Sequence, residues 1–412
     1  MNIFTLRRNR LMNELKNNAC VILFSGKAIM KTEDESYDFF VNRNFYYYTG
    51  IDAEGMALMM TRNNDVITHK LFILPYDEYL AKWVGGRMKP EEATSISEIE
   101  DIEDINDLDE QFASFYNRTR GRRGFSLYLD LWHYNPEQHL TPAHEFAGKV
   151  AKNYPSIQIK DIYSYITQFR LIKDEYEISC IKKAISITKN GIEAMMHNIM
   201  PNQNEMFMEG VFQFALMRSL CKETAFKTIA ASGKRATVLH YSDNNDIMKD
   251  GELFLCDLGA TYQKYNADIS RTFPVNGKFT DRQKEIYEIV LAAQKIVEEN
   301  AKPGVGLRQL NQMVIEFYKE ELPKHGLNKD VSEYYFHGVS HHLGLDTHDV
   351  DGGLGATLKK GMVITNEPGL YIEDESIGIR IEDDLLITDN GCENLAKDII
   401  KKVEDIEELM RH

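Results

Sequence analysis

The sequence has few cysteines and prolines, no long hydrophobic run and no excess of basic residues. Its five cysteines are odd in number and nowhere spaced as Cys-x-x-Cys, which argues against a disulfide framework or a thiolate zinc site. Ten prolines and 26 glycines in 412 residues exclude a collagen-like or wholly disordered chain. No apolar run approaches the roughly 20 residues that a membrane helix needs, and the first residues do not resemble a secretory signal.

Acidic residues dominate the charge, with 64 Asp and Glu against 48 Lys and Arg and a net charge of −16. No basic field is available to bind nucleic acid or an anionic membrane. We therefore expect a soluble cytoplasmic protein with a sizeable core. The acidic stretch 91–110 has isoleucines at intervals of three, which predicts an amphipathic surface segment. A site for a cationic partner is the weaker alternative.

The hydrophobic pattern divides the chain near residue 165. Residues 1–165 alternate short strand-like runs with helical or polar stretches, which predicts an α/β domain. A long helical pattern begins near residue 168, and hairpin-like units separated by helices follow it. One helix is expected to begin after Thr280, because Gln283 lies three residues on, as in a capping box.

Two acidic residues, Asp257 and Asp268, lie on or beside apolar strands of the C-terminal part. A hairpin turning near Tyr262 and Gln263 would place these two side chains opposite each other, with Cβ atoms about 5 Å apart. A carboxylate on an apolar strand is costly unless it is paired or bound to a metal. The pair therefore predicts a cation between the two acids.

A second acidic pair repeats this arrangement. A hairpin turning near Glu375 would place Glu367 opposite Glu382. Arg380 lies two residues before Glu382 and so on the same face of its strand. For either pair the alternative is a surface carboxylate pair, or a salt bridge to Arg271 or Arg380. Because two such pairs occur on apolar strands, this alternative is less favoured than it would be for a single pair.

Four of the twelve histidines lie within residues 337–349, namely His337, His341, His342 and His348. The segment is not the zincin motif His-Glu-x-x-His, because position 338 is glycine. Four carboxylates and an imidazole make a hard, oxygen-rich site that favours a pair of Mn²⁺, Co²⁺ or Zn²⁺ ions over a thiolate zinc site. Their charge of −4 would balance two divalent cations.

In this order, these residues resemble the pita-bread metallopeptidase family, which includes aminopeptidase P, prolidase and methionine aminopeptidase. The resemblance implies an α+β fold, with a pita-bread catalytic domain at 166–412 and a smaller α/β domain of the aminopeptidase P type at 1–165. It also implies two divalent metal ions, Mn²⁺ first and Co²⁺ or Zn²⁺ as alternatives. The implied metal ligands are Asp257, Asp268, His341, Glu367 and Glu382.

Each ligand has an implied role. Asp257 would belong to one metal, His341 and Glu367 to the other, with Asp268 and Glu382 as the bridging pair. Glu367 would also accept the proton of a water or hydroxide that bridges the metals.

Further residues match catalytic positions of the family. His240, His337 and His348 resemble the substrate histidines, which would stabilise the oxyanion and pass a proton to the leaving nitrogen. Arg380 matches the arginine that orients the site. His342 stands where a tryptophan or another hydrophobic residue is expected, so we interpret it as a local variant and not a ligand.

The N-terminal part narrows the choice within the family. Residues 7–11 and 40–50 resemble the N-terminal domain of aminopeptidase P, which methionine aminopeptidases lack. Taken without the resemblance, Phe45 to Tyr48 predict a strand with aromatic packing. Trp83 resembles a tryptophan that closes the active site of a neighbouring subunit.

Together these features imply an Xaa-Pro aminopeptidase, a metal-dependent hydrolase that releases the residue before a penultimate proline. An Xaa-Pro dipeptidase (prolidase) is the alternative, because it shares every ligand. A non-catalytic pita-bread protein that binds a peptide or a partner is more distant. The resemblance also implies a homodimer or homotetramer, with peptides as the substrates.

Overall fold

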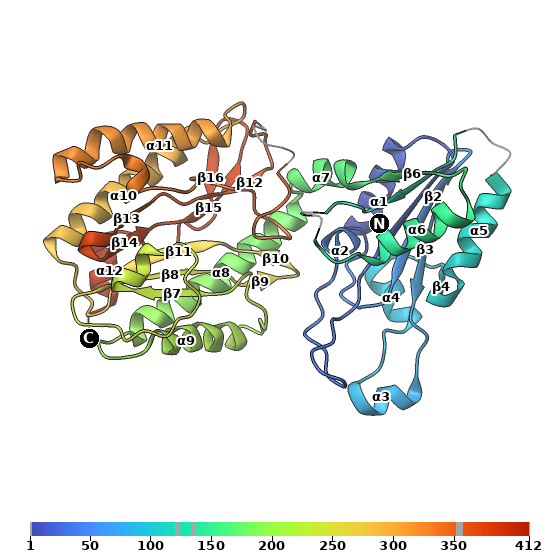
Figure 1. The fold of residues 1–412 in the computed structure, drawn as a ribbon, viewed down its shortest axis with the longest axis horizontal. Coiled ribbons are helices and arrows are strands. Elements are labelled where there is room, and N and C mark those ends of the chain that lie inside the picture. The colour runs from blue at the N-terminus through green and yellow to red at the C-terminus, as the bar shows by residue number, and fades with distance from the viewer. Residues whose placement is uncertain (1, 120–123, 134, 136, 352–356, 412) are drawn as a thin grey trace. The chain divides into compact units, whose positions relative to one another are not determined.

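The structure is a computed structural model that describes residues 2–119, 124–133, 135, 137–351 and 357–411. The chain forms two compact units, residues 1–167 and 168–412, and each is described by itself (Figure 1). Within the described ranges, no helix is both long and apolar enough to cross a membrane.

The first unit is built around a six-stranded sheet with the strand order β4-β3-β2-β1-β5-β6. Apolar side chains of the strands and of helices α5 and α6 form its core, around Ile22, Phe72 and Phe112. The acidic stretch 91–110 runs from α4 through a connecting segment, β4 and η1 to the start of α5. The elements are α1 (Ile3–Glu14), β1 (Ala19–Phe24), α2 (Arg43–Thr49), β2 (Ala57–Asn63), β3 (Val66–Ile73), α3 (Glu78–Val84), α4 (Pro90–Ser97), β4 (Ile102–Asp104), η1 (Ile105–Asp107), α5 (Leu108–Thr119), β5 (Ser126–Leu129), α6 (Pro142–Asn153) and β6 (Gln158–Asp161).

The strand expected at Phe45 to Tyr48 is instead helix α2, so that prediction was wrong. Asn42 caps its N-terminus by accepting a hydrogen bond from the Phe45 N–H, and Gly50 ends it in the left-handed conformation, at φ 71°. Arg8 Nη1 donates to the carbonyl oxygen of Tyr48, over 2.8 Å. Distant side chains thus satisfy carbonyls at the end of this short helix.

The second unit follows α7 (Tyr163–Leu171), which crosses the boundary at residue 167. As expected, Thr280 and Gln283 form a capping box at the start of α10. The elements are α8 (Glu175–Asn198), α9 (Glu205–Arg218), β7 (Ile229–Ser232), η2 (Gly233–Thr237), β8 (Leu253–Leu258), β9 (Thr261–Tyr262), β10 (Tyr265–Asn266), β11 (Ile269–Pro274), α10 (Asp281–Asn300), α11 (Leu307–Glu321), η3 (Leu322–His325), η4 (Val331–Glu333), β12 (Val363–Asn366), β13 (Gly369–Ile372), η5 (Glu373–Glu375), β14 (Ile377–Arg380), β15 (Asp383–Ile387), β16 (Cys392–Asn394) and α12 (Val403–Leu409).

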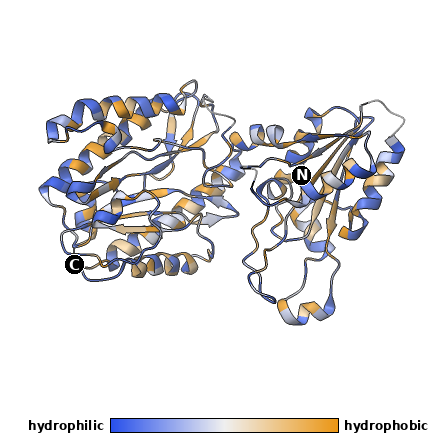
Figure 2. Cartoon of the chain, in the orientation of Figure 1, coloured by the Kyte–Doolittle hydropathy of each residue, from blue (hydrophilic) through white to orange (hydrophobic). Residues whose placement is uncertain are grey.

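Short antiparallel sheets form the centre of this unit, in the orders β11-β8-β7, β12-β15-β16, β13-β14 and β10-β9. Helices α8 and α9 pack against β7 and β9 to β11, whereas α10 packs against β12 to β14. Hydrophobic and hydrophilic residues alternate along α10 and α11 (Figure 2), as expected for helices with one buried face. The helices thereby cover the sheets.

The strand register corrects one expectation and confirms another. Asp257 pairs with Ser270 and not with Asp268, because the tight turn lies at residues 263–264, one residue later than expected. The shift in pairing is two residues, so Asp257 and Asp268 still share a face, as diagonal neighbours. In the second hairpin, Gly369 pairs with Arg380 and Asn366 with Asp383. This register places Glu367 opposite Glu382, as predicted.

Candidate metal centre and active site

Asp257 and Arg380 form a buried ion pair at the centre of the second unit. Asp257 lies in β8, and its Oδ2 accepts a hydrogen bond from Arg380 Nη2 over 2.7 Å. Its other oxygen, Oδ1, is buried and has no hydrogen-bond partner among the described residues. A buried carboxylate oxygen without a donor is costly, so this atom is a candidate metal ligand.

Ser270 links the arginine to the second acidic pair. Its Oγ donates to Glu382 Oε2 over 2.7 Å and accepts from Arg380 Nε over 2.8 Å. The Glu382 N–H also donates to the Ser270 carbonyl oxygen over 3.1 Å. The side chains of Arg380 and Glu382 are therefore fixed relative to each other and to strand β11.

Thr365 links two further predicted ligands, His341 and Glu367. Its hydroxyl accepts a hydrogen bond from the His341 N–H over 3.0 Å and donates to Glu367 Oε1 over 3.1 Å. His341 Nε2 lies 3.4 Å from both Glu367 Oε1 and Asp268 Oδ2. His341 Nδ1 lies 3.1 Å from the His342 carbonyl, an arrangement that orients a ligating imidazole and leaves Nε2 toward the carboxylates.

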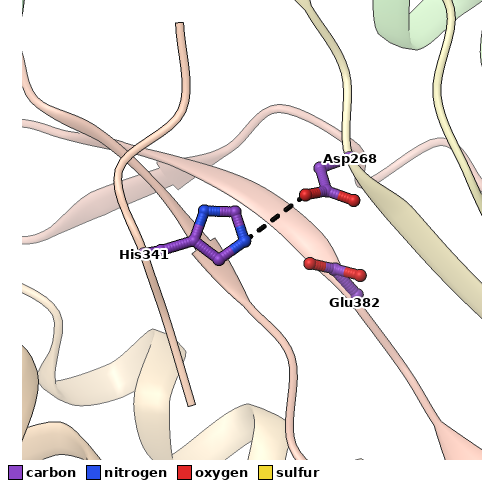
Figure 3. Close-up of side chains that lie close together, drawn as sticks. All are labelled: Asp268, His341 and Glu382. Atoms are coloured by element: carbon purple, nitrogen blue, oxygen red, sulfur yellow. Dashed lines mark ion pairs between the residues drawn. The ribbon is translucent and has the colours of Figure 1, made fainter. Parts of the chain in front are cut away.

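Asp268, His341 and Glu382 each offer an atom that lies within 4.8 Å of the others, the spacing expected of ligands to one metal ion. Figure 3 shows the three side chains pointing toward one another, with an ion pair between His341 and Asp268. Asp268 comes from the residue before β11, and Glu382 from between β14 and β15. Segments distant in sequence thus converge on one point.

The carboxylates of this cluster are buried close together, which raises the pKa of three of them. Burial raises the pKa of Asp268 to about 7, helped by the nearby charges of Asp257 and Glu367. Burial and neighbouring acids also raise the pKa of Glu367 and, much more, that of Glu382. Burial opposes the charged form of His341, but Asp268 and Glu367 raise its pKa to about 9. Such a cluster is stabilised when positive charge is placed among its oxygens.

His337 is held in one orientation beside this cluster. Its Nδ1 lies 2.8 Å from the Gly338 carbonyl, which can only accept, so Nδ1 carries the proton. Burial and the charge of Arg380 lower the pKa of His337 to about 4. Its Nε2 therefore accepts from the Tyr371 hydroxyl over 2.9 Å, and that hydroxyl in turn accepts from Arg380 Nη1 over 2.9 Å.

The other histidines differ in their surroundings. The His348 ring lies 4.4 Å from the His341 ring in an edge-to-face arrangement, and the exposed His240 lines the same cavity. His342 is buried and does not line the cavity, and its pKa is lowered to about 4 by burial and by Lys173. These positions agree with the interpretation of His342 as a local variant.

One cavity of about 550 Å³ brings the predicted residues together. Its size is within the range of small-molecule and peptide sites. All nine predicted site residues line it: Asp257, Asp268, His240, His337, His341, His348, Glu367, Arg380 and Glu382. Trp83 lies in α3 of the first unit, with a side chain that is 72% exposed.

Residues 179–389, just over half of the chain, match the family model described as metallopeptidase family M24. The chain belongs to this family. Residues 4–122 match the model of the aminopeptidase P N-terminal domain.

Known Xaa-Pro aminopeptidases match the chain over nearly its whole length. The Xaa-Pro aminopeptidase of Haemophilus influenzae is 34% identical, with 99% of this chain and 96% of the relative covered. That of Escherichia coli is 31% identical, with 99% and 97% covered. Zinc-substituted aminopeptidase P of E. coli in complex with product aligns with a TM-score of 0.90 at 29% identity, over 99% of this chain and 97% of that one. The expected α+β pita-bread fold is thereby confirmed.

Sequence reasoning missed Ser270, Thr365 and Tyr371, which hold the predicted residues in place. The alternation of side chains along a strand offered a clue to each of these three residues. Ser270 lies two residues after Asp268, and Thr365 two residues before Glu367. Tyr371 pairs with Gly378, two residues from Arg380. Side chains two residues apart on a strand share a face, so this alternation could have placed each of them on the face that carries the acids.

Proposed function

We propose that the protein is an Xaa-Pro aminopeptidase, a metallopeptidase that releases the N-terminal residue of peptides with proline in second position. The observation that carries this proposal is the cavity that gathers the five proposed metal ligands and three further histidines. It lies in a chain that is similar along its length to Xaa-Pro aminopeptidases. E. coli aminopeptidase P, with the same fold, has been solved with the inhibitor Pro-Leu.

The proposed ligands are Asp257 for one metal, His341 and Glu367 for the other, and Asp268 and Glu382 for both. These donors fit divalent ions, because they are mainly oxygens with a total charge of −4 and because Asp257 Oδ1 is buried with no donor among the described residues. Such ions, when bound, lower the pKa of water and polarise a carbonyl. Mn²⁺ is our first choice for a hard, oxygen-rich site, with Co²⁺ or Zn²⁺ as alternatives.

The protein's own residues then have distinct tasks. Glu367, oriented by the Thr365 hydroxyl, accepts the proton of the attacking water. His240, His337 and His348 stabilise the charge that develops on the substrate carbonyl oxygen and return a proton to the leaving nitrogen. His337 has to exchange its hydrogen bond with the Tyr371 hydroxyl before it can donate in this way. Arg380 holds the Asp257 carboxylate in place.

Proline explains why a dedicated enzyme is needed. Its nitrogen carries no hydrogen and its ring fixes φ. A peptidase that binds the N–H after the scissile bond would therefore lose a contact with an Xaa-Pro peptide. In the proposed reaction the leaving group is the ring nitrogen, which must gain a proton to depart, and this gives the cavity histidines their role.

The test is a product analysis with three peptides. Purified protein is incubated with Ala-Pro-Ala, Ala-Ala-Ala and Ala-Pro, with Mn²⁺, Co²⁺ or Zn²⁺ added in turn. Release of alanine from Ala-Pro-Ala, with Ala-Ala-Ala intact, is the expected result. Cleavage of Ala-Pro alone would favour the dipeptidase. No product with any metal, and less than one bound ion per chain, would favour a non-catalytic binding protein.

We further propose a cytoplasmic homodimer or homotetramer, with the aminopeptidase P-type N-terminal domain at 1–165 and the catalytic domain at 166–412. Support comes from the family resemblance and from the five cysteines, none of which forms a disulfide. Light scattering coupled to size-exclusion chromatography measures the oligomer, and cell fractionation measures the location. A monomer at micromolar concentration, or recovery outside the cytoplasmic fraction, would contradict these two assignments.

A further inference from the structure

We propose that Lys227 binds a carboxylate of the substrate and so gives the enzyme a preference for peptides with a negative charge near the scissile bond. This inference rests on the proposed function. Lys227 lines the cavity together with the predicted ligands. The carboxylate has two sources in a peptide: the C-terminus of a short substrate, or an acidic side chain on the residue before proline.

Lys227 lies beside the start of strand β7, which carries one wall of the cavity. Ile229, the first residue of β7, pairs directly with Asp257 of β8, so their side chains share a face. Lys227 lies two residues before Ile229. Lys227 belongs to the segment that leads into β7, about 7 Å from Ile229 along the chain. Both Ile229 and Lys227 line the cavity.

The backbone that carries Lys227 is anchored on both sides. The Thr228 carbonyl accepts a hydrogen bond from Asn244 Nδ2 over 2.9 Å. The Ala225 N–H donates to the Gly259 carbonyl over 2.8 Å, and the Ala225 carbonyl accepts from Thr347 Oγ1 over 3.3 Å. The exposed lysine side chain therefore extends from a fixed position, which is what selective contact with a substrate group requires.

Lys227 is a basic residue of this cavity whose charge is not paired with an acidic group among the described residues. Arg380 is the other Lys or Arg among the described lining residues, and it is buried with donors directed to Asp257, Ser270 and Tyr371. Lys227 has no hydrogen-bond or ion-pair partner within the described ranges, and its side chain is exposed. Its ammonium is thus available to a ligand that enters the cavity.

The chemistry of this position selects anions. With two divalent ions bound, the four ligand carboxylates are neutralised, and Lys227 becomes an uncompensated positive charge at the cavity wall. It repels a second cation on the substrate and attracts a carboxylate. The neighbouring lining residues Phe226 and Leu239 are apolar, so they offer the substrate contact area without a competing charge.

The experiment compares matched charged and neutral peptides on the metal-loaded enzyme. Lys227→Met removes the charge and keeps most of the stem, and Lys227→Arg retains the charge. Lys222→Met is the matched control, since Lys222 is also exposed but does not line the cavity. One arm compares Ala-Pro-Ala with its C-terminal amide. The other compares Asp-Pro-Ala amide with Asn-Pro-Ala amide.

For at least one pair, we expect the wild type and Lys227→Arg to prefer the carboxylate form in kcat/KM. Lys227→Met should lose about 2- to 5-fold of that preference, the range of an exposed ion pair, mainly through KM. Added salt should weaken the wild-type preference. Loss in the first arm identifies the C-terminus and loss in the second identifies the side chain.

Two outcomes count against the inference, and they are distinct from failure of the proposed function. Wild-type enzyme that cleaves all four peptides without a charge preference would overturn the role of Lys227. So would Lys227→Met that slows charged and neutral peptides equally. Wild-type enzyme that cleaves none of them would refute the proposed function itself.

Discussion

Ser270 fixes Glu382, one member of the second acidic pair, relative to Arg380. It bonds both Arg380 and Glu382, and its side chain is fully buried. Ser270→Ala would leave a buried donor and a buried acceptor unpaired, at a cost of about 1–3 kcal/mol. Loss of such a supporting contact is also expected to weaken metal binding about 10- to 100-fold. Urea unfolding and metal titration measure the two effects.

The control for this variant is Ser179→Ala, because Ser179 on α8 donates to the Tyr176 carbonyl at an exposed position. We expect this control to bind metal as the wild type does. Wild-type metal affinity in Ser270→Ala would show that Ser270 does not orient Glu382.

Glu367 is the residue expected to matter most for turnover. Glu367→Gln keeps the size of the side chain but removes its ability to accept a proton. We expect kcat on Ala-Pro-Ala to fall about 10²- to 10⁴-fold, the usual contribution of a general base. The assay is run at saturating metal, with bound metal measured on the same sample. Glu373→Gln is the control, since Glu373 pairs with Lys234 at the surface. Near wild-type turnover with full metal occupancy would exclude Glu367 as the base.

At the scale of elements, the sequence predicted which side chains share a face of a sheet better than it predicted which residues pair across neighbouring strands. Alternation on apolar strands correctly put Asp257 and Asp268 on one face. It could not give the exact pairing, because this depends on the turn at residues 263–264, where both residues adopt positive φ. The extra two-strand hairpin shifts Asp257 onto Ser270. A shift of two residues keeps Asp257 and Asp268 on the same face of the sheet. The two acids therefore remain close together although the predicted pairing was wrong.

Helix α2 shows a kind of element that local pattern does not reveal. Its aromatic residues favour a strand, yet they form a helix whose C-terminal carbonyls accept hydrogen bonds from Arg7 and Arg8, 40 residues away. Those contacts exist only in the folded unit. A prediction from local pattern therefore lacks the interactions that decide the outcome.

The segment 341–349, which carries His341 and His348, is held by a buried ion cluster. Asp349 accepts from Arg170 Nη2 over 2.5 Å and from Lys173 Nζ over 3.0 Å. Asp349→Asn would leave two buried cations under-compensated, so we expect a loss of about 3–5 kcal/mol in the free energy of unfolding. Chemical denaturation measures this loss. The control Asp346→Asn removes a half-exposed partner of the same Arg170 and should cost about 1 kcal/mol or less.

The same cluster predicts a pH dependence. Burial alone would raise the pKa of Asp349, but Arg170 and Lys173 outweigh it and lower this pKa to about 2. The unfolded value is about 3.9. Because the folded pKa is depressed, the stabilisation is complete above about pH 4 and is lost as pH falls toward 2. Wild type should therefore lose stability more steeply than Asp349→Asn between pH 4 and 2. Parallel slopes in urea unfolding would contradict the assignment.

At the scale of the whole molecule, every proposed ligand lies in the second unit, between residues 257 and 382. The first unit has a core of its own, formed by β1, β2, β3, β5, α5 and α6. Metal binding should therefore stabilise the two units unequally. Ligand binding to the folded state adds about 2.7 kcal/mol when the free ligand is at 100 times Kd, so removal of the ions should destabilise residues 168–412 selectively.

The two tryptophans make this selectivity measurable. Trp83 and Trp132 are the only tryptophans in the chain, and both lie in residues 1–167. Tryptophan fluorescence thus follows the first unit, whereas far-ultraviolet circular dichroism follows the helices of both. After treatment with a chelator, we expect a lower-temperature transition in circular dichroism and little change in the fluorescence transition. Readdition of Mn²⁺ should restore the first signal. An equal shift of both signals would mean that the units unfold together, and no shift in either would mean that the acidic cluster binds no metal.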